Sequence, residues 1–188
     1  MRPTLSLALG LIASLVIILA GALGGFTFAP DAEAVRSLGL FRAARPDLTT
    51  ALVWLTHLGG AAFLLPVALA TGGFLWWRGA RRSAAWLLLA ILGGRAMVEL
   101  LKWITDRPRP GFEAHPVAVA SQAFPSGHAA NSMITYLSIA LFAAPPRWRG
   151  ASVAGALLLS LAIGATRPIL GVHWPTDVVG GWLFGALW

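Results

Sequence analysis

Two polar stretches of this chain carry closely spaced basic and histidine side chains, and each lies between long apolar runs. The first covers residues 102–128 (KWITDRPRPGFEAHPVAVASQAFPSGH), and the second covers residues 166–177 (TRPILGVHWPTD). Lysine offers a compact positive charge and arginine a planar fork of N–H donors, a combination that suits the oxygens of a phosphoryl group. We therefore expect the two stretches to meet in space and to form one phosphate-binding site.

The basic residues of the first stretch surround two prolines. Pro108 and Pro110 lack amide donors and restrict the residues before them, so a helix must end near Asp106. Lys102 is then expected at a helix end, and Arg109 on an extended turn that can fold back toward it. The competing interpretation is a set of interfacial arginines that only contact lipid headgroups.

The first stretch ends in Pro125-Ser126-Gly127-His128, a sequence that predicts the start of a helix. Gly127 allows a close backbone approach, and free amides at a helix N-terminus favour an anion. We expect an anion to be held at this helix start, with His128 next to it on the first turn. The alternative is an ordinary proline-capped helix with an unrelated histidine.

His173 and Asp177 in the second stretch are four residues apart, and Pro175 marks a helix start around them, so their side chains can meet. An aspartate that accepts the Nδ1 proton would leave Nε2 of His173 unprotonated and ready to act as a nucleophile. Arg167, six residues before His173 and across an expected proline turn, can bind the same anion. The rival interpretation is a zinc site of two histidines and an aspartate, but the clustered cationic side chains would repel a dication.

Hydrophobic residues make up 57% of the 188 residues and charged residues 11%, against roughly 25% charged in a soluble domain. We predict an all-α, polytopic membrane protein, organised as a single domain over residues 1–188. A membrane span needs about 20 apolar residues, and six runs are candidates. These runs lie at 5–28, 51–77, 84–104, 126–144, 151–166 and 173–188.

The net charge of +7 does not indicate nucleic acid as a partner. The basic residues are scattered over short loops, with no basic helix or aromatic-rich sheet, so the membrane bilayer with its anionic lipid is favoured. The chain has no cysteine, which excludes disulfides, thiolate nucleophiles and thiolate metal sites.

Two predicted helices separate the polar stretches, so both stretches are expected on the same side of the membrane. Basic loops favour the cytoplasm, but the raw counts of basic residues on the two sides are nearly equal. If Lys102, Arg109 and Arg167 are set aside as ligand-binding residues, more basic residues remain on the side that carries the loops at 78–82 and 147–149. The polar stretches are then expected on the extracytoplasmic face of the cell membrane.

Arg95 and Glu99 are four residues apart in an apolar run, and ionisable residues at membrane depth usually pair or line a functional cavity. We expect Glu99 to neutralise Arg95, to orient Lys102, or to do both. His57 is interpreted as a hydrogen-bonded structural residue.

Three segments, KWITDRPRP, PSGH and TRPILGVHWPTD, resemble the signature motifs of the type 2 phosphatidic acid phosphatases, the integral-membrane lipid phosphate phosphatases. The first motif is a lysine, six residues and Arg-Pro, matched by Lys102 and Arg109, while Arg107 begins an extra Arg-Pro pair out of register. The second motif is matched by residues 125–128.

The third motif is matched by Arg167, His173 and Asp177, with Thr166 in place of the usual serine. The resemblance implies a bundle of six transmembrane helices, with catalytic loops between helices 3 and 4 and between helices 5 and 6 on one face.

The resemblance also implies a two-step hydrolysis without metal or cofactor. His173 would attack phosphorus and form a phosphohistidine, Asp177 would orient it, and His128 would protonate the departing alkoxide and then activate water. The phosphate oxygens would be held by Lys102, Arg109, Ser126, Gly127 and Arg167.

The expected substrate is a lipid phosphate: phosphatidic acid, phosphatidylglycerol phosphate or a polyprenyl pyrophosphate. The alternatives are a non-catalytic lipid-phosphate binder or transporter and, less favoured because such enzymes are soluble, a vanadate-dependent haloperoxidase.

Overall fold

The chain is helical over most of the residues that the computed structural model describes, 29–112 and 115–188. No strand occurs in these two ranges, and the predicted run 5–28 lies outside the described residues. The elements in order are α2 (Ala29–Ala43), α3 (Pro46–His57), α4 (Ala61–Trp77), α5 (Arg81–Thr105), α6 (Gly127–Phe142), the 3₁₀-helix η1 (Pro146–Trp148), α7 (Arg149–Ile169) and α8 (Pro175–Leu187).

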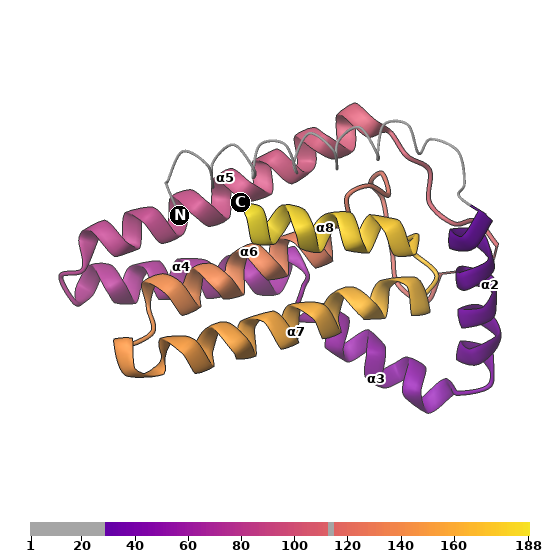
Figure 1. Ribbon diagram of the computed structural model, residues 1–188, viewed down its shortest axis with the longest axis horizontal. Coiled ribbons are helices and arrows are strands. Elements are labelled where there is room, and N and C mark those ends of the chain that lie inside the picture. Colours follow the sequence, from indigo (N-terminus) through magenta and orange to yellow (C-terminus); the bar gives the residue numbers. More distant parts are fainter. Residues whose placement is uncertain (1–28, 113–114) are drawn as a thin grey trace.

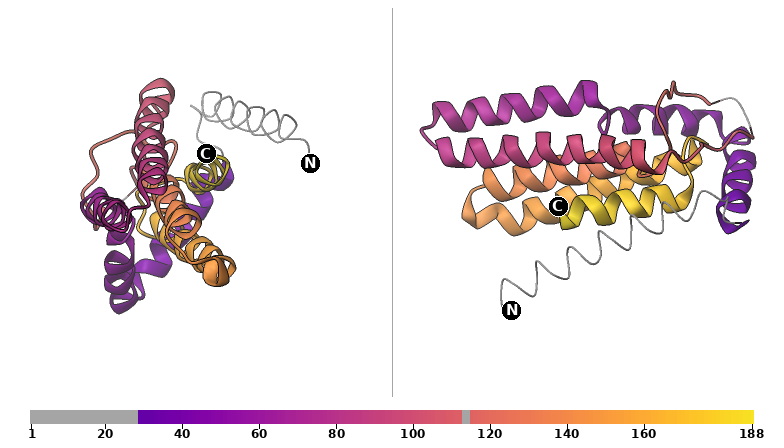
Figure 2. Two further views of the ribbon diagram at one scale, coloured as in Figure 1. Left: turned by 90° about the vertical axis from the view of Figure 1, so that its left-hand side faces the viewer. Right: turned by 90° about the horizontal axis from the view of Figure 1, so that it is seen from above.

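Helices α4 to α8 lie along the length of the molecule, whereas α2 stands across one end and α3 slopes from α2 toward the bundle (Figures 1 and 2). The central helix is α6, which packs against α5, α7 and α8. The core around it is apolar and includes Leu87, Val98 and Ile134, all buried. Close packing of this kind holds helices together inside a bilayer, where lipid tails are as apolar as the core.

Three helical segments are long and apolar enough to cross a membrane: Pro46–Trp77, Arg81–Thr105 and Pro146–Ile169. Large apolar side chains such as Trp86 and Leu158 point outward from them and are more than half exposed, as a lipid-facing surface requires. The prediction of an all-helical membrane protein is therefore confirmed. Helices α6 and α8 fall within two further predicted runs but are shorter than a full span.

The predicted run 51–77 is not one continuous helix, because the chain turns at residues 58–60 between α3 and α4. A Cβ atom on Gly59 would overlap the side chain of Ile163 and lie 3.3 Å from Cδ2 of His128. The glycine therefore allows this corner to pack directly against α6 and α7. The segment before it, expected as an interfacial piece or a connector, forms α2 and the start of α3.

Helix ends bring the two polar stretches to the end of the bundle that α2 crosses. Helix α5 ends at Thr105, next to the predicted boundary, and Asp106 adopts a left-handed conformation with φ of 42°. Helix α8 begins at Pro175, as its sequence predicts. Helix α7 continues through Pro168, so Arg167 lies on the last turn of a helix and not in the proline turn expected from the sequence.

Candidate active site

A cavity of about 190 Å³ is lined by side chains from both polar stretches and by the turn between α3 and α4. Six of the expected site residues contribute to its wall: Lys102, Arg109, Gly127, His128, Arg167 and His173. Hydrogen bonds join the two stretches directly, since Nη1 of Arg109 donates to the Val172 carbonyl at 2.7 Å. The structure thus brings together residues 65 positions apart in the sequence, from Lys102 to Arg167.

His173 is buried between a carboxylate and a guanidinium. Its Nδ1 lies 3.3 Å from Oδ2 of Asp177, and its Nε2 lies 3.0 Å from Nη1 of Arg109. A guanidinium N–H can only donate, so Nε2 is the acceptor and the ring proton is on Nδ1, facing Asp177. This is the tautomer that the sequence predicts for a nucleophilic imidazole.

Burial of the ring is the largest cause that holds the pKa of His173 well below its usual value of 6.5, and Arg109 adds to it. Burial likewise lowers the pKa of Arg109, while the charge of Asp177 opposes that shift. Burial raises the pKa of Asp177 to about 6, and Arg107 opposes the rise. At neutral pH the pair is therefore a neutral imidazole next to a carboxylate.

Lys102 and Arg109 are held by the same short segment of the loop before α6. Nζ of Lys102 donates to the Gln122 carbonyl at 2.6 Å, and Nε of Arg109 donates to the Ser121 carbonyl at 2.6 Å. Both side chains thereby reach the cavity from one side, and Lys102 is only 3% exposed although it ends a long apolar helix.

Arg167 reaches the cavity from α7. Its Nη1 donates to Oγ1 of Thr56 at 2.8 Å, and its buried Nε has no partner within the described part of the chain. A buried donor without a partner is costly, so this N–H is a natural contact for a bound anion. The neighbouring Thr166 donates its hydroxyl to the Ile163 carbonyl at 2.6 Å and does not line the cavity.

The Pro-Ser-Gly-His turn approaches the cavity as expected, with one difference. The Ser126 amide donates to the Asp177 carbonyl at 2.9 Å, so it is engaged within the protein and not directed at the cavity. The Ser126 hydroxyl is buried and has no partner among the described residues. Gly127 passes close to Lys102, because a Cβ atom on it would lie 3.5 Å from the lysine Cε. His128 lines the cavity beside the glycine turn of residues 58–60.

Sequence reasoning missed two residues of the hydrogen-bond network that leads to Asp177. Arg107, dismissed as an extra Arg-Pro pair, is buried and donates from Nη1 to Oδ1 of Asp177 at 2.6 Å. Its Nη2 donates to Oδ2 of Asp31, on α2, at 2.9 Å. The available signal was the DRPRP sequence itself, which places Arg107 two residues before Arg109 in the same polar stretch.

Four more residues of the apolar runs lie in or near the site. Arg95 and Glu99 both line the cavity, and the expected ion pair between them is absent from the described salt bridges. Asn131 also lines the cavity, one turn beyond His128, and was not singled out from the sequence. His57 is hydrogen-bonded to the Val53 carbonyl at 2.6 Å, in agreement with a structural role.

Known proteins share this sequence pattern and this fold. Residues 83–188 match the PAP2 superfamily. Phosphatidylglycerophosphatase B of Bacillus subtilis (strain 168) is 32% identical over 148 residues, which cover 76% of this chain and 72% of the relative. An undecaprenyl-diphosphatase of Sulfolobus acidocaldarius is 25% identical over 140 residues, covering 72% of this chain and 64% of the relative.

A solved structure agrees with these relatives. The crystal structure of the first transmembrane PAP2 type phosphatidylglycerolphosphate phosphatase from Bacillus subtilis superposes with a TM-score of 0.83 at 31% identity. The superposition covers 94% of this chain and 90% of that chain. By sequence and by fold, this chain belongs to the PAP2 superfamily.

Proposed function

We propose that this chain removes the terminal phosphate of a membrane lipid in two steps, through a phosphohistidine on His173. That it is a lipid phosphatase is supported by its family and by relatives named as phosphatases. The observation that carries the mechanism is the buried His173, whose Nε2 lone pair faces Arg109 in a cavity also lined by Lys102 and Arg167.

In the first step, a phosphate group with a charge of about −1.5 to −2 enters between the three cationic side chains. The hydrogen bond that Arg109 donates to Nε2 of His173 is replaced by one to a phosphate oxygen. The lone pair of Nε2 is then free to attack phosphorus. The P–N bond forms as the P–O bond to the lipid breaks, and His128, which takes up a proton when the phosphate dianion enters beside it, gives that proton to the departing oxygen. Asp177 stabilises the positive charge that develops on the imidazole.

In the second step, His128 is neutral and removes a proton from a water molecule, whose oxygen attacks phosphorus. The P–N bond breaks, and inorganic phosphate leaves. The negative charge of each transition state is spread over three oxygens, and preorganised donors that surround it supply the largest catalytic contribution. Lys102, Arg109, Arg167, the Ser126 hydroxyl and the Gly127 amide are the proposed donors.

The substrate is proposed to be amphiphilic, with its phosphate reaching the site from the bilayer interface. Phosphatidylglycerol phosphate, phosphatidic acid and a polyprenyl pyrophosphate are the three candidates, and two of them correspond to the named activities of relatives. The reaction is proposed to need no metal, because Arg107 already binds the carboxylate of Asp177 next to His173, and the cationic Lys102, Arg109 and Arg167 line the cavity.

Wild-type protein in detergent, with a chelator present, is expected to release inorganic phosphate from at least one of the three candidate lipids. The fixed charges of the cavity replace a metal in this reaction, so the chelator should not lower the rate. Phosphate release by purified protein is measured with each lipid, with and without added magnesium.

His173→Ala, purified in the same way, is the control for contaminating phosphatases. Release that requires added metal would contradict the metal-independent route. If no lipid is hydrolysed but all three bind, the chain would be a lipid-phosphate binder.

We also propose that residues 1–188 form one domain with six spans, formed by residues 5–28, the α3–α4 pair and helices α5 to α8. The catalytic loops would lie on the extracytoplasmic face. The lack of cysteine makes this testable, because each single-cysteine variant carries one thiol.

Ala44→Cys, at the exposed corner between α2 and α3, is expected to react with an impermeant thiol reagent on intact cells. Arg82→Cys, exposed at the start of α5, should react only after the cells are permeabilised. The two corners lie at opposite ends of the bundle (Figure 1). Labelling of Arg82→Cys alone on intact cells would place the cavity in the cytoplasm.

A further inference from the structure

Asp31, in the first turn of α2, is an acidic residue far from the signature motifs in sequence yet only 2% exposed. Its Oδ2 accepts a hydrogen bond from Nη2 of Arg107 at 2.9 Å. Its Oδ1 accepts the Thr176 amide at 3.1 Å, and the Thr176 hydroxyl donates to Oδ2. Both oxygens of this buried carboxylate are therefore hydrogen-bonded. Their partners, Arg107 and Thr176, lie next to Asp177, the carboxylate that faces His173.

Arg107 continues the connection from Asp31 to the site. Its Nη1 donates to Oδ1 of Asp177 at 2.6 Å and to the Thr176 hydroxyl at 2.8 Å. The other oxygen of Asp177, Oδ2, accepts the Trp174 amide and faces Nδ1 of the histidine. The orientation of that carboxylate is thus set by Arg107 on one side, while Asp31 fixes the position of Arg107.

The Asp31 carboxylate also caps the first turn of α8, beside the bond from the Trp174 amide to Asp177. The first amides of a helix have no partner within the helix, and Thr176 is the second residue of α8. A negative charge at a helix N-terminus is favourable, so Asp31 stabilises the turn that carries Asp177. The Asp31 carboxylate therefore binds both the first turn of α8 and the guanidinium of Arg107, which together set the position of Asp177.

We propose that Asp31 and Arg107 are positioning residues, which orient Asp177 and through it the attacking nitrogen of His173. The inference rests on the proposed function, in which His173 is the nucleophile. It assigns α2 a part in catalysis, because this helix supplies Asp31. Asp31 binds Arg107, Arg107 binds Asp177, and Asp177 faces the imidazole of His173. A basic side chain elsewhere could not replace Arg107, because its planar guanidinium binds the carboxylates of Asp31 and Asp177 at the same time.

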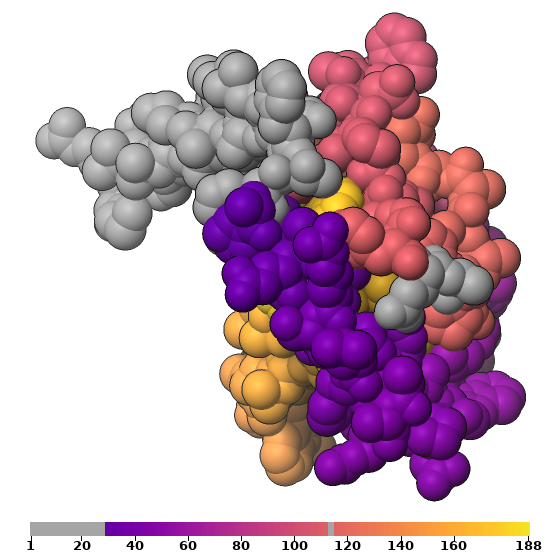
Figure 3. All heavy atoms as spheres, turned by 90° about the vertical axis from the view of Figure 1, so that its right-hand side faces the viewer, coloured from indigo at the N-terminus to yellow at the C-terminus, as the bar shows by residue number. Residues whose placement is uncertain are grey.

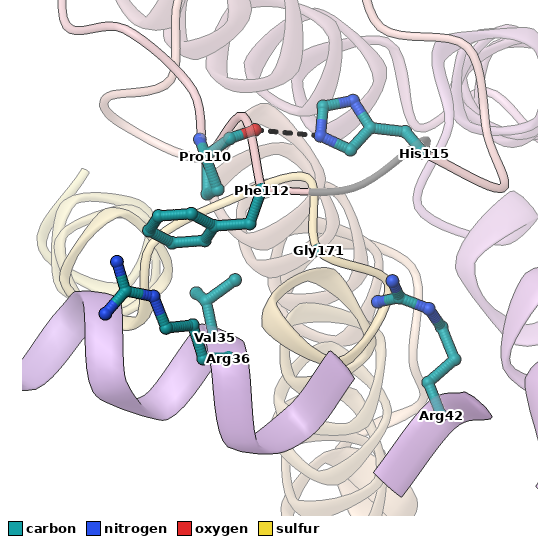
Figure 4. A pocket seen from close by; sticks show the side chains of 7 residues that line it. All are labelled: Val35, Arg36, Arg42, Pro110, Phe112, His115 and Gly171. Atoms are coloured by element: carbon teal, nitrogen blue, oxygen red, sulfur yellow. Dashed lines mark hydrogen bonds between the residues drawn. The ribbon is translucent and has the colours of Figure 1, made fainter. Parts of the chain in front are cut away.

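Helix α2 has other attachments, so a change at Asp31 need not release it. Figure 3 shows α2 lying across this end of the molecule beside the loop that follows α5. The Arg36 guanidinium lies 4.5 Å from the centre of the Phe112 ring, and Nη1 of Arg42 donates to the Ile169 carbonyl at 2.7 Å. These side chains surround a recess between α2 and the loop, where His115 also bonds to the Pro110 carbonyl (Figure 4).

The test compares Asp31→Asn with Glu33→Gln, which removes an exposed carboxylate from the same helix. Asp31→Asn is expected to lower kcat roughly 10- to 100-fold, the range seen when outer partners of active-site ligands are lost. KM should change little, because Lys102, Arg109 and Arg167 still bind the phosphate. Glu33→Gln should behave as wild type, and Asp31→Glu should recover part of the rate.

The deciding measurement is a double-mutant cycle with Asp177→Asn. If Asp31 acts through Asp177, adding Asp31→Asn to Asp177→Asn should change kcat by less than about twofold. A carboxylate that only stabilises the fold would lower the rate by the same factor in both backgrounds, and that result would overturn the proposal. An inactive wild type would instead refute the proposed function, so the two failures differ.

The acid limb of the pH profile of kcat gives an independent readout. The charged groups facing Asp177 are Arg107, Asp31 and His173, with Lys102 and Arg109 farther away. Removing the Arg107 charge, as in Arg107→Gln, should raise the pKa of Asp177 above about 6 and move the limb to higher pH. Asp31→Asn removes a negative neighbour and should move the limb to lower pH. The phosphate of the substrate titrates identically in every variant, so it cannot cause a difference between them. An acid limb at the same pH in wild type and both variants would contradict the proposal.

Discussion

His173→Ala should abolish turnover, with a loss of about 10⁴-fold or more in kcat, the scale seen when a covalent nucleophile is removed. The side chain has no substitute nearby: the described cavity contains only one other histidine, His128, whose proposed task is proton transfer. Phosphate binding should survive, because the three cationic side chains remain. The measurement is phosphate release together with alkaline-quench labelling by a lipid that carries ³²P in its terminal phosphate.

The labelling experiment separates a lost nucleophile from a lost fold. Wild type should trap a label that is stable in alkali and labile in acid, as a phosphohistidine is, and His173→Ala should trap none. His115→Ala is the matched control, since His115 lies in the same loop system but outside the cavity. Turnover near the wild-type rate by the His173 variant would refute the two-step mechanism.

His128→Ala should lower kcat by about 10²- to 10⁴-fold with a lipid substrate, the usual contribution of a general acid or base. The reason is that a lipid alkoxide is a poor leaving group unless it is protonated as it departs. An aryl phosphate such as p-nitrophenyl phosphate needs no such proton. With that substrate the first step should be nearly restored, whereas the second step still lacks its base.

The variant should therefore release one equivalent of p-nitrophenol per site in a fast burst. Slow turnover should follow, because the phosphohistidine is hydrolysed slowly without a base. Rapid-mixing absorbance measurements would detect the burst. His57→Ala, which removes an exposed histidine that does not line the cavity, is the control. If the variant showed no burst with the aryl substrate, His128 would not act as the acid of the first step.

Much of this fold follows from hydropathy and helix-ending residues. The runs 84–104 and 151–166 became α5 and α7 with small changes at their ends, because twenty apolar residues have few alternatives to a membrane helix. The break at residues 58–60 was not predicted. Its cause is tertiary, since the glycines permit a close approach to His128 that no local pattern reveals.

The candidate site was predictable to the extent that its residues are close in sequence or share a recognisable motif. His173 and Asp177 are four residues apart, so their contact could be expected. The contact of Asp31 with Arg107 could not, because it joins residues 76 positions apart and depends on how α2 crosses the bundle. Arg167 was assigned to the right site but to the wrong local structure, since Pro168 is accommodated within α7.

In the proposed mechanism, the hydrogen bond from Arg109 to Nε2 of His173 keeps the nucleophile masked. The lone pair is occupied until a group arrives that attracts the guanidinium more strongly than an imidazole does, and a phosphate dianion is such a group. Neutral electrophiles, including carbonyl esters of the surrounding lipids, offer the guanidinium no comparable partner. Selectivity for phosphate would then be exerted before any bond is made, by the substrate's ability to uncover the atom that attacks it.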